Sequence, residues 1–187
     1  PSRKYIIIGF YVMKLVIIGA SGNGAVVRST MEDMRADGQD WEFVGYLDDA
    51  HGAAKDSEII ATVTPENIQK IIASSDVYFF YSLNSVKLQQ NSKEIWESLN
   101  IPTQRCATLV HPTAVVSKFV NLKPGVAIQP LVNIGPGVSV GTNVHIFAQA
   151  MIGHHSSLGD FSYVSNNACI GGYCKLEEGA YVGTNAT

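Results

Sequence analysis

The sequence predicts an α/β unit with a small parallel sheet, followed by a β-solenoid. From His111 onward, the 187-residue chain divides into hexads without an insertion or a deletion. A fixed short period of this kind indicates a repeat architecture. Before that point, residues 14–110 alternate apolar strand-like runs with helical patterns, which is typical of a parallel sheet flanked by helices. The two halves of the chain therefore follow different patterns.

The sixth residue of every hexad is aliphatic. The fourth residue is always Val, Ala, Ser or Cys, and turn-forming Gly, Pro or Asn often follows the sixth residue. This pattern favours short strands joined by tight corners over helices. The sixth residues are Val116, Leu122, Ile128, Ile134, Val140, Ile146, Ile152, Leu158, Val164, Ile170, Leu176 and Val182.

This pattern resembles the left-handed parallel β-helix of hexapeptide-repeat acyltransferases, in which three hexads form one triangular coil. The resemblance implies four coils here, and it also supplies the handedness. Residues eighteen apart would then stack about 4.8 Å apart, the usual strand spacing. One expected ladder contains Ile128, Ile146, Val164 and Val182, and another contains Ile134, Ile152 and Ile170.

The first half of the chain has the pattern of a small Rossmann-like sheet. Thr64 and Pro65 mark one helix start, as N-cap and first helical residue. Strands are expected over about 15–19, 42–47 and 76–81, and helices over about 25–36, 64–74 and 86–99. Residues 103–110 would then lead into the solenoid.

A glycine-rich turn, Gly19-Ala-Ser-Gly-Asn-Gly24, joins the first strand to the first helix. Backbone N–H groups at a helix N-terminus favour phosphate or carboxylate. The spacing Gly-x-x-Gly-x-Gly is not the dinucleotide fingerprint, so a tight turn without a ligand stays open. Asp48 and Asp49 end the second strand, where Rossmann-type sites place an acidic residue, although a solvated turn is an equal alternative.

Composition argues against nucleic-acid and membrane functions. Thirteen Lys and Arg stand against sixteen Asp and Glu, with no basic run, so a polyphosphate backbone would not be neutralised. The apolar stretch 5–20 is interrupted by Lys14 and is shorter than the roughly 20 residues that cross a bilayer. The three cysteines lack zinc-site spacing. We expect reduced thiols, no metal site and a cytoplasmic location.

Both ends of the sequence carry expectations of their own. Residues 1–12 begin with basic residues and continue with a short apolar run, but the run from Met13 leads directly into a buried strand. We therefore expect 1–12 to be a non-native or mis-assigned extension and not a signal peptide. The chain stops inside a repeat at Thr187, so we expect a truncated C-terminus.

The glycine loop, Asp48-Asp49, the Leu109-Val-His-Pro112 sequence and a histidine-bearing solenoid occur in one order. This combination resembles the NeuD/PglD-type sugar acetyltransferases. The resemblance implies an acceptor-binding domain over 13–108, a β-helix domain over 109–187 and a homotrimer. It also implies acetyl-CoA as co-substrate and the amine of a nucleotide-linked amino sugar as acceptor. Sialic acid O-acetylation and a non-catalytic nucleotide-binding scaffold are the alternatives.

The same resemblance assigns the site residues. His154 matches the general base, and His155 stands where a carboxylate normally follows, so it could share or take that role. Without the family pattern, this pair would be a structural corner pair. Acceptor binding is expected at Ser21, Gly22, Asn23, Gly24, Asp48 and Asp49, where Asn23 replaces a common His. Acetyl-CoA is expected near Tyr163, which replaces a His, and near Gly172 and Thr184. His111 at the domain junction is expected to be structural.

Overall fold

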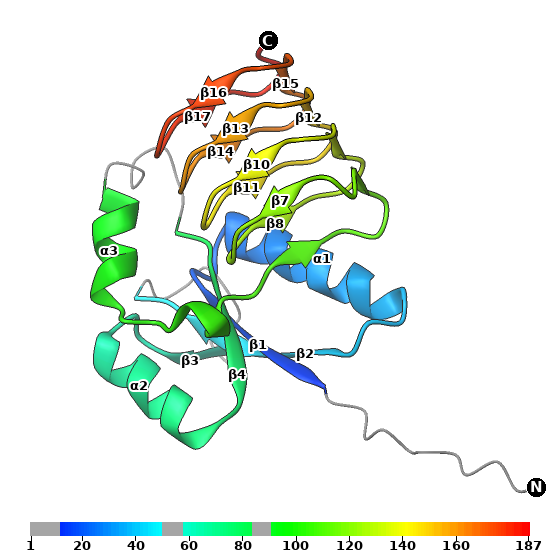
Figure 1. Ribbon diagram of the computed structural model, residues 1–187. Helices are drawn as coiled ribbons and strands as arrows, with labels where there is room; N and C mark the ends of the chain where they lie inside the picture. Colours follow the sequence, from blue (N-terminus) through cyan, green and yellow to red (C-terminus); the bar gives the residue numbers. More distant parts are fainter. Residues whose placement is uncertain (1–11, 50–57, 84–90) are drawn as a thin grey trace, which may run out of the picture.

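The computed structural model describes residues 12–49, 58–83 and 91–187, which form an α/β unit and a column of stacked coils (Figure 1). The expected extension at 1–12 lies outside the described residues except for Val12. The first part of the expected helix at 86–99 also lies outside them.

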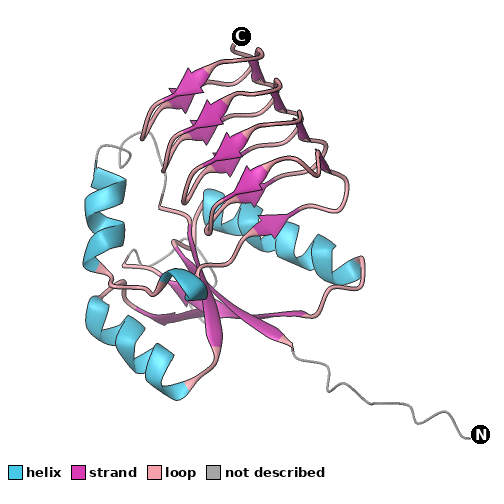
Figure 2. Ribbon diagram, in the orientation of Figure 1, coloured by secondary structure: helices cyan, strands magenta, loops and turns pink. Residues whose placement is uncertain are grey.

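The α/β unit is built on a four-stranded parallel sheet (Figure 2). Its strands, in the spatial order β3-β2-β1-β4, are β1 (Met13–Ile18), β2 (Trp41–Leu47), β3 (Ile59–Ala61) and β4 (Val77–Tyr81). From β1, the chain continues through β2 and β3 on one side of the sheet and then returns to place β4 on the other side of β1. Ligands of open α/β sheets bind outside the carboxyl ends of the strands at such a switch point, and the glycine loop follows β1 directly.

Alternation along β1 explains why both faces of the sheet are covered. Leu15 and Ile17 pack against α1 (Asn23–Ala36), whereas Val16 and Ile18 point to the opposite face. That opposite face is covered by α2 (Pro65–Ser74) and α3 (Ser92–Ser98). These four side chains of β1 are fully buried, as expected for a strand between two helical layers.

The predicted start of α2 is confirmed. Thr64 has extended backbone dihedrals, and its hydroxyl accepts a hydrogen bond from the amide of Asn67 at 3.2 Å. Pro65 is the first helical residue, where its missing N–H costs nothing. Strand β3 was not predicted, because its three residues are too few to show an alternating pattern.

The coils form a left-handed parallel β-helix with three faces. Each strand pairs in parallel with the strand eighteen residues away. Face 1 contains β5 (Leu109–Val110), β8 (Ala127–Ile128), β11 (His145–Ile146), β14 (Tyr163–Val164) and β17 (Tyr181–Val182). Face 2 contains β6 (Val115–Val116), β9 (Asn133–Ile134), β12 (Met151–Ile152) and β15 (Cys169–Ile170). Face 3 contains β7 (Asn121–Leu122), β10 (Ser139–Val140), β13 (Ser157–Leu158) and β16 (Lys175–Leu176).

Both predicted aliphatic ladders are confirmed. Ile128, Ile146, Val164 and Val182 are successive register partners on face 1. Ile134, Ile152 and Ile170 are successive partners on face 2. These side chains belong to one continuous core that fills the β-helix. The small fourth-position residues mostly line this core too, but Cys174 is exposed because it is the last residue of its column in this chain.

The corners of the β-helix share one unusual backbone conformation. From residue 125 to residue 185, every sixth residue has a φ between 53° and 82°. Side chains rarely adopt this left-handed conformation, and Gly and Asn tolerate it best. The eleven corner residues are Gly125, Leu131, Gly137, Asn143, Gln149, His155, Phe161, Asn167, Tyr173, Gly179 and Asn185.

The two parts of the chain share their hydrophobic cores along face 1. Leu109 and Ala127 pack into the core beneath α1. Phe161 packs into the core on the other side of the sheet, where its ring meets the Tyr81 ring edge-on with centroids 6.4 Å apart. Face 1 is therefore the side of the β-helix that docks on the α/β unit.

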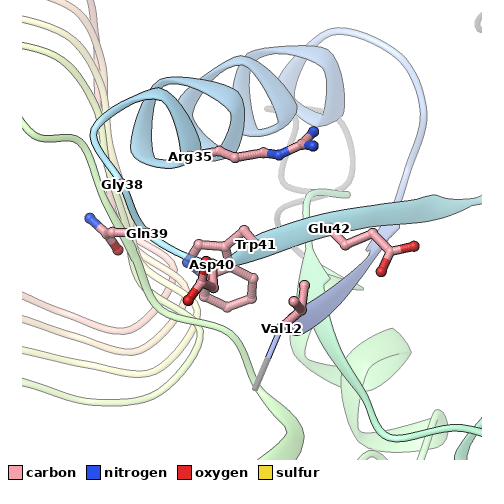
Figure 3. Close-up of a pocket in the computed structure, with 7 residues that line it drawn as sticks. All are labelled: Val12, Arg35, Gly38, Gln39, Asp40, Trp41 and Glu42. Atoms are coloured by element: carbon pink, nitrogen blue, oxygen red, sulfur yellow. The ribbon is translucent and has the colours of Figure 1, made fainter. Parts of the chain in front are cut away.

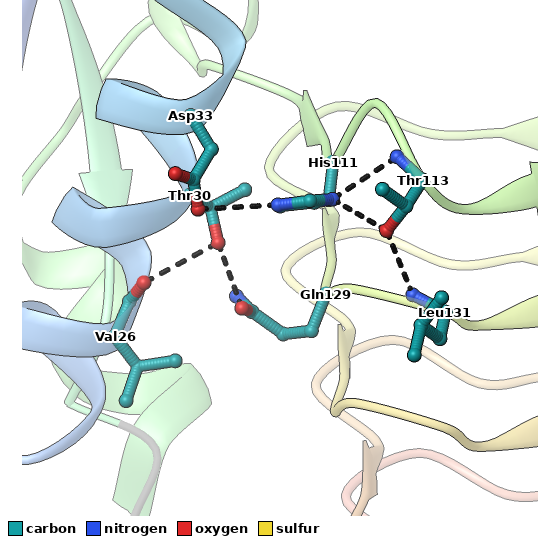
Figure 4. A network of polar contacts seen from close by, with 7 residues as sticks. All are labelled: Val26, Thr30, Asp33, His111, Thr113, Gln129 and Leu131. Carbon is teal, nitrogen blue, oxygen red and sulfur yellow. Dashed lines mark hydrogen bonds and ion pairs between the residues drawn. The ribbon is translucent and has the colours of Figure 1, made fainter. Parts of the chain in front are cut away.

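A polar network fixes the junction between the two parts (Figure 4). His111 is 8% exposed, and its Nε2 lies 3.1 Å from a carboxylate oxygen of Asp33 on α1. Its Nδ1 accepts a hydrogen bond from the amide of Thr113. The Thr30 hydroxyl of α1 donates to the Gln129 side chain at 2.7 Å. The predicted structural role of His111 is confirmed.

Candidate active site

The glycine loop is a close-packed turn. A Cβ atom at Gly24 would lie 1.8 Å from the carbonyl oxygen of Gly19, so only glycine fits there. Gly22 has φ 50° and ψ −102°, a combination that glycine alone adopts readily. The Ser82 hydroxyl at the end of β4 lies 2.7 Å from the Ile18 carbonyl oxygen. Sequence reasoning missed Ser82, although a serine directly after an apolar strand marks the carboxyl edge of the sheet.

The acidic pair supports the loops at this edge. Asp48 is 9% exposed, and its carboxylate accepts a hydrogen bond from the Ala20 amide at 2.6 Å. Asp49 accepts a hydrogen bond from the Val63 amide at 2.7 Å. Asp48 thus braces the glycine loop, whereas Asp49 holds the segment after β3. The Asp48 carboxylate therefore lies at the expected acceptor loop, and Asp49 is the next residue at the same edge of the sheet.

The N-terminus of α1 has the features of an anion-binding end. No side chain caps the helix, and its first turn contains no acidic residue. Ser21 and Gly22 are exposed just before the helix begins. Because the helix dipole and the first N–H groups favour negative charge, this end of α1 can receive a phosphate or carboxylate group.

Tyr163 on face 1 reaches the glycine loop. Its hydroxyl donates a hydrogen bond to the Asn23 side-chain oxygen at 3.4 Å. Burial raises the pKa of Tyr163 to about 12, aided by the nearby Tyr181, so the hydroxyl stays a donor at neutral pH. The ring packs against Phe147 at a tilt of 30°, with centroids 4.6 Å apart, and stacks on Tyr181 at 5.0 Å. Two residues expected in different roles, Asn23 and Tyr163, are therefore brought together.

His145 lies beneath this aromatic stack. It is fully buried, and burial lowers its pKa to about 4. Its Nε2 lies 2.9 Å from the Tyr81 carbonyl oxygen, so the neutral ring carries its proton on Nε2 and donates it. This histidine ties face 1 to the end of β4. The hexad spacing could have predicted that His145 lies next to Tyr163, since it is eighteen residues, or one coil, before it.

His154 and His155 lie at the corner between faces 2 and 3, and both are exposed. Their Nδ1 atoms are 3.1 Å apart, within hydrogen-bond distance. Tyr173 from the next coil stacks on the His155 ring with centroids 5.1 Å apart and meets the His154 ring edge-on at 5.0 Å. Tyr173 was not predicted, although it follows His155 by one coil.

Two glycines make room for the imidazole rings. A Cβ at Gly172 would lie 2.9 Å from Cε1 and Nε2 of His154. A Cβ at Gly137 would lie 2.9 Å from Cδ2 of His155. Gly172, expected near acetyl-CoA, therefore lies directly against the expected base.

Within one chain, the structure separates the histidine corner from the glycine loop. Face 1 and its two flanking corners contact the α/β unit, through residues such as Tyr163, Gln129 and Glu178. His154 lies at the third corner, across the triangular coil from face 1. Thr184 is exposed at the corner between faces 1 and 2, so it lies apart from Gly172.

A pocket with a volume of about 460 Å³ lies at the opposite edge of the sheet (Figure 3). It is lined by Trp41 and Glu42 at the start of β2, by Arg35 near the end of α1, and by Val12, Gly38, Gln39 and Asp40. This edge carries the amino ends of β1 and β2, so the pocket is separate from the glycine loop.

Across 12–49, 58–83 and 91–187, no helix has the length and apolar character of a membrane span. The same residues contain no group of three His, Cys, Asp or Glu side chains suited to holding a metal ion.

Comparison with known families identifies the first part of the chain. Residues 14–91 match the PglD N-terminal domain. The predicted NeuD/PglD-type resemblance is confirmed. No curated protein sequence matches the chain significantly. The matched PglD-type segment contains the sheet, the glycine loop and Asp48-Asp49.

Solved structures extend the likeness to the β-helix. WeeI from Acinetobacter baumannii is 16% identical, with 93% of this chain and 79% of that chain covered and a TM-score of 0.73. A His-to-Asn mutant of perosamine N-acetyltransferase from Caulobacter crescentus, with CoA and GDP-perosamine, is 19% identical, with 94% and 91% covered and a TM-score of 0.57.

A third solved structure is the acetyltransferase domain of PglB from Neisseria gonorrhoeae, in complex with acetyl coenzyme A. It is 19% identical, with 94% of this chain and 98% of that chain covered and a TM-score of 0.51. At these identities, the likeness establishes a shared fold that joins the PglD-type domain to the β-helix.

Proposed function

We propose that this protein transfers the acetyl group of acetyl-CoA to the amino group of a nucleotide-linked amino sugar. The observation that carries the proposal is that one chain has an uncapped helix end suited to phosphate and an exposed imidazole on a hexad β-helix. Solved structures of the same fold contain CoA with GDP-perosamine, or acetyl coenzyme A.

The acceptor would bind at the carboxyl edge of the sheet. Ser21, Gly22 and Gly24 would present backbone N–H groups to the diphosphate, supported by the positive end of α1. Asp48 and Asp49 lie beside this loop and would accept hydrogen bonds from the nucleoside. Asn23 would contact the sugar, with its side chain oriented by the Tyr163 hydroxyl.

His154 would act as the general base. The amine nitrogen attacks the thioester carbonyl carbon while Nε2 of His154 accepts the proton that this nitrogen loses. The tetrahedral intermediate then collapses, the carbon–sulfur bond breaks, and the thiolate takes the proton to give CoA. A neutral imidazole suits this task near neutral pH. No covalent enzyme intermediate is needed, because holding both substrates together supplies much of the acceleration.

The donor would bind along the β-helix beside the base. Gly172 lies against the His154 ring, so a thioester placed over Gly172 would be within reach of Nε2. Tyr163 and Thr184 lie elsewhere on the same chain. We propose that Thr184, at the corner beside face 2, contacts acetyl-CoA where neighbouring chains meet, and that Tyr163 contacts it beside the glycine loop.

A homotrimer would complete the site. The glycine loop and the His154 corner lie on opposite sides of one β-helix, so a second copy must bring its histidine corner to the loop. Face 2 is suited to contact between copies, because its outward residues are uncharged and two of them are exposed apolar side chains. These outward residues are Val115, Asn133, Met151 and Cys169.

The direct test is an acetyl-transfer assay in which the release of CoA is followed. Acetyl-CoA is incubated with UDP-, GDP- and dTDP-linked 4-amino sugars and with sialic acid. We expect CoA release with one amino sugar and complete loss of that release in His154→Ala, which stays folded because His154 is exposed. Release with sialic acid alone would favour O-acetylation, and release unaffected by His154→Ala would remove the proposed base. Silence across the whole panel would favour a scaffold role.

A further inference from the structure

His154 has a single close side-chain hydrogen-bond partner among the described residues, and that partner is another histidine. We propose that His155 is a positioning residue that holds His154 as the tautomer with its proton on Nδ1, leaving Nε2 free as the base. The inference rests on the proposed acetyl transfer and adds the group that selects the reactive form of its base.

The protonation states of the two rings decide whether the contact between their Nδ1 atoms is a hydrogen bond. Two Nδ1 atoms 3.1 Å apart form a hydrogen bond only when one carries a proton and the other has a free lone pair. If His155 were the donor, His154 would carry its proton on Nε2 and could not accept another there. If His154 is the donor, its Nε2 lone pair is free. Only the second arrangement gives a base at the outer nitrogen.

The same arrangement also suits the protonated state. When Nε2 of His154 accepts the proton from the amine, its Nδ1–H remains hydrogen-bonded to the Nδ1 lone pair of neutral His155. The hydrogen bond to a charged donor is the stronger kind, so it stabilises the imidazolium. The same proton then leaves from Nε2 to the CoA sulfur, and the pair returns to its starting state.

Among the described residues, the stacked turns of this corner contain no carboxylate that could pair with His154. The four stacked turns at this corner are 117–120, 135–138, 153–156 and 171–174, and Lys118 is the one charged residue in them. The titratable groups from the adjacent coil are Tyr173 and Cys174. A neutral imidazole acceptor therefore stands where an anionic acceptor would otherwise raise the pKa of the base.

The His155 ring is held in place from both sides. Its backbone has φ 57°, and its amide donates to the Pro136 carbonyl oxygen at 3.0 Å. Tyr173 stacks on the ring from the next coil, whereas Gly137 lies on the other side without a Cβ. Ser156 ties this turn to the next coil by donating to the Gly171 carbonyl oxygen at 2.8 Å. A ring held this firmly can orient its neighbour.

The test reads the tautomer of His154 directly by long-range 1H–15N NMR of the imidazole rings, with His154→Gln used to assign the signals. In the wild type at pH 8, we expect a protonated Nδ1 and an unprotonated Nε2 on His154. His155→Phe keeps a ring on Tyr173 but removes the acceptor, and Phe161, at the equivalent position of the next corner, shows that phenylalanine can adopt this backbone conformation. We expect His154 in that variant to become a mixture of tautomers.

Kinetics supply the second readout. His155→Phe should lower kcat by about 10- to 100-fold, the usual effect of losing a group that orients a functional imidazole, with the KM for acetyl-CoA unchanged. His155→Glu should restore kcat and move the acidic limb of the pH profile upward by about one unit. A wild-type His154 protonated on Nε2, or a tautomer unchanged in His155→Phe, would overturn the proposal. The NMR result needs no substrate, so it separates this failure from a failure of the proposed acetyl transfer.

Discussion

The Tyr163 hydroxyl on face 1 of the β-helix donates a hydrogen bond to the Asn23 side-chain oxygen in the glycine loop, across 3.4 Å. The contact joins residues 140 positions apart in the sequence. It places the expected acceptor loop against a face of the β-helix that does not carry His154. In the proposed site, the acceptor end would therefore be built within one chain, and the base would come from another.

Tyr163→Phe should weaken acceptor binding without unfolding the protein. The ring keeps its packing against Phe147 and its stacking on Tyr181, so the loss is one hydrogen bond, about 0.5–1.5 kcal/mol of stability. Without that bond, the Asn23 side chain is no longer oriented. We expect a several-fold higher KM for the sugar nucleotide in steady-state assays. Tyr181→Phe removes the hydrogen bond from Ser165 and should leave this KM unchanged; an equal rise in both variants would argue against a specific role for Tyr163.

Gly24→Ala should disrupt the glycine loop. Its Cβ would lie 1.8 Å from the Gly19 carbonyl oxygen, a backbone atom that cannot move without distorting the turn after β1. We expect a loss of about 3 kcal/mol or more in urea unfolding, together with loss of nucleotide binding by calorimetry. Ala25→Ser, at the exposed neighbouring position, is the matched control and should bind normally. Wild-type stability in Gly24→Ala would show that the loop is not close-packed.

His145 should make the protein less stable in mild acid. Burial lowers its pKa from 6.5 to about 4, so between these values the unfolded chain binds a proton that the folded chain does not. The stabilisation is complete above pH 6.5 and is lost progressively as the pH falls towards 4. The loss is about 3 kcal/mol over this window. Urea unfolding at several pH values measures it.

His145→Phe is the control for that pH dependence. The phenyl ring can keep the stacking on Phe147 and Tyr163, but it cannot donate to the Tyr81 carbonyl oxygen or bind a proton. We expect lower stability at pH 7.5 and a smaller fall between pH 6.5 and pH 4. If the unfolding free energy of the variant falls as steeply as that of the wild type, other groups cause the pH dependence.

His111→Ala should loosen the junction between the two parts of the chain. The buried ring connects Asp33 on α1 with Thr113 on the first coil, and its removal leaves the Thr113 amide without an acceptor. We expect a loss of about 1–3 kcal/mol of unfolding free energy. Asp33→Asn keeps an acceptor for Nε2 and should lose less. Equal losses in the two variants would mean that the contact with Asp33, and not the one with Thr113, carries the effect.

The repeat could be predicted from sequence because one constraint recurs in every hexad. An aliphatic side chain such as Ile146 must fill the interior at each sixth residue, and this period shows in the sequence without any tertiary information. The sheet of the α/β unit was also predictable from its apolar runs. Strand β3 was not, because Ile59–Ala61 is defined by pairing with β2 and not by a pattern of its own.

The candidate site was only partly predictable, because its contacts join distant positions. The glycine loop was found from a local motif, whereas His154 was assigned from the resemblance to the NeuD/PglD-type enzymes. The bond between Asn23 and Tyr163, the hydroxyl of Ser82 beneath the loop and the ring of Tyr173 over His155 all depend on tertiary packing. The eighteen-residue spacing places Tyr173 above His155, but no local signal shows that its ring stacks there.

The most direct test of the shared site is complementation between two inactive variants. His154→Ala lacks the base, and Ser21→Asp, at an exposed position of the glycine loop, repels phosphate while leaving the close-packed Gly24 in place. Each is dissociated, mixed with the other, reassembled and assayed for acetyl transfer to the sugar that the wild type uses. We expect the mixture to regain activity, because some assembled sites combine an intact His154 from one chain with an intact loop from another. A mixture that co-assembles but stays as inactive as either variant alone would contradict a site built from two chains.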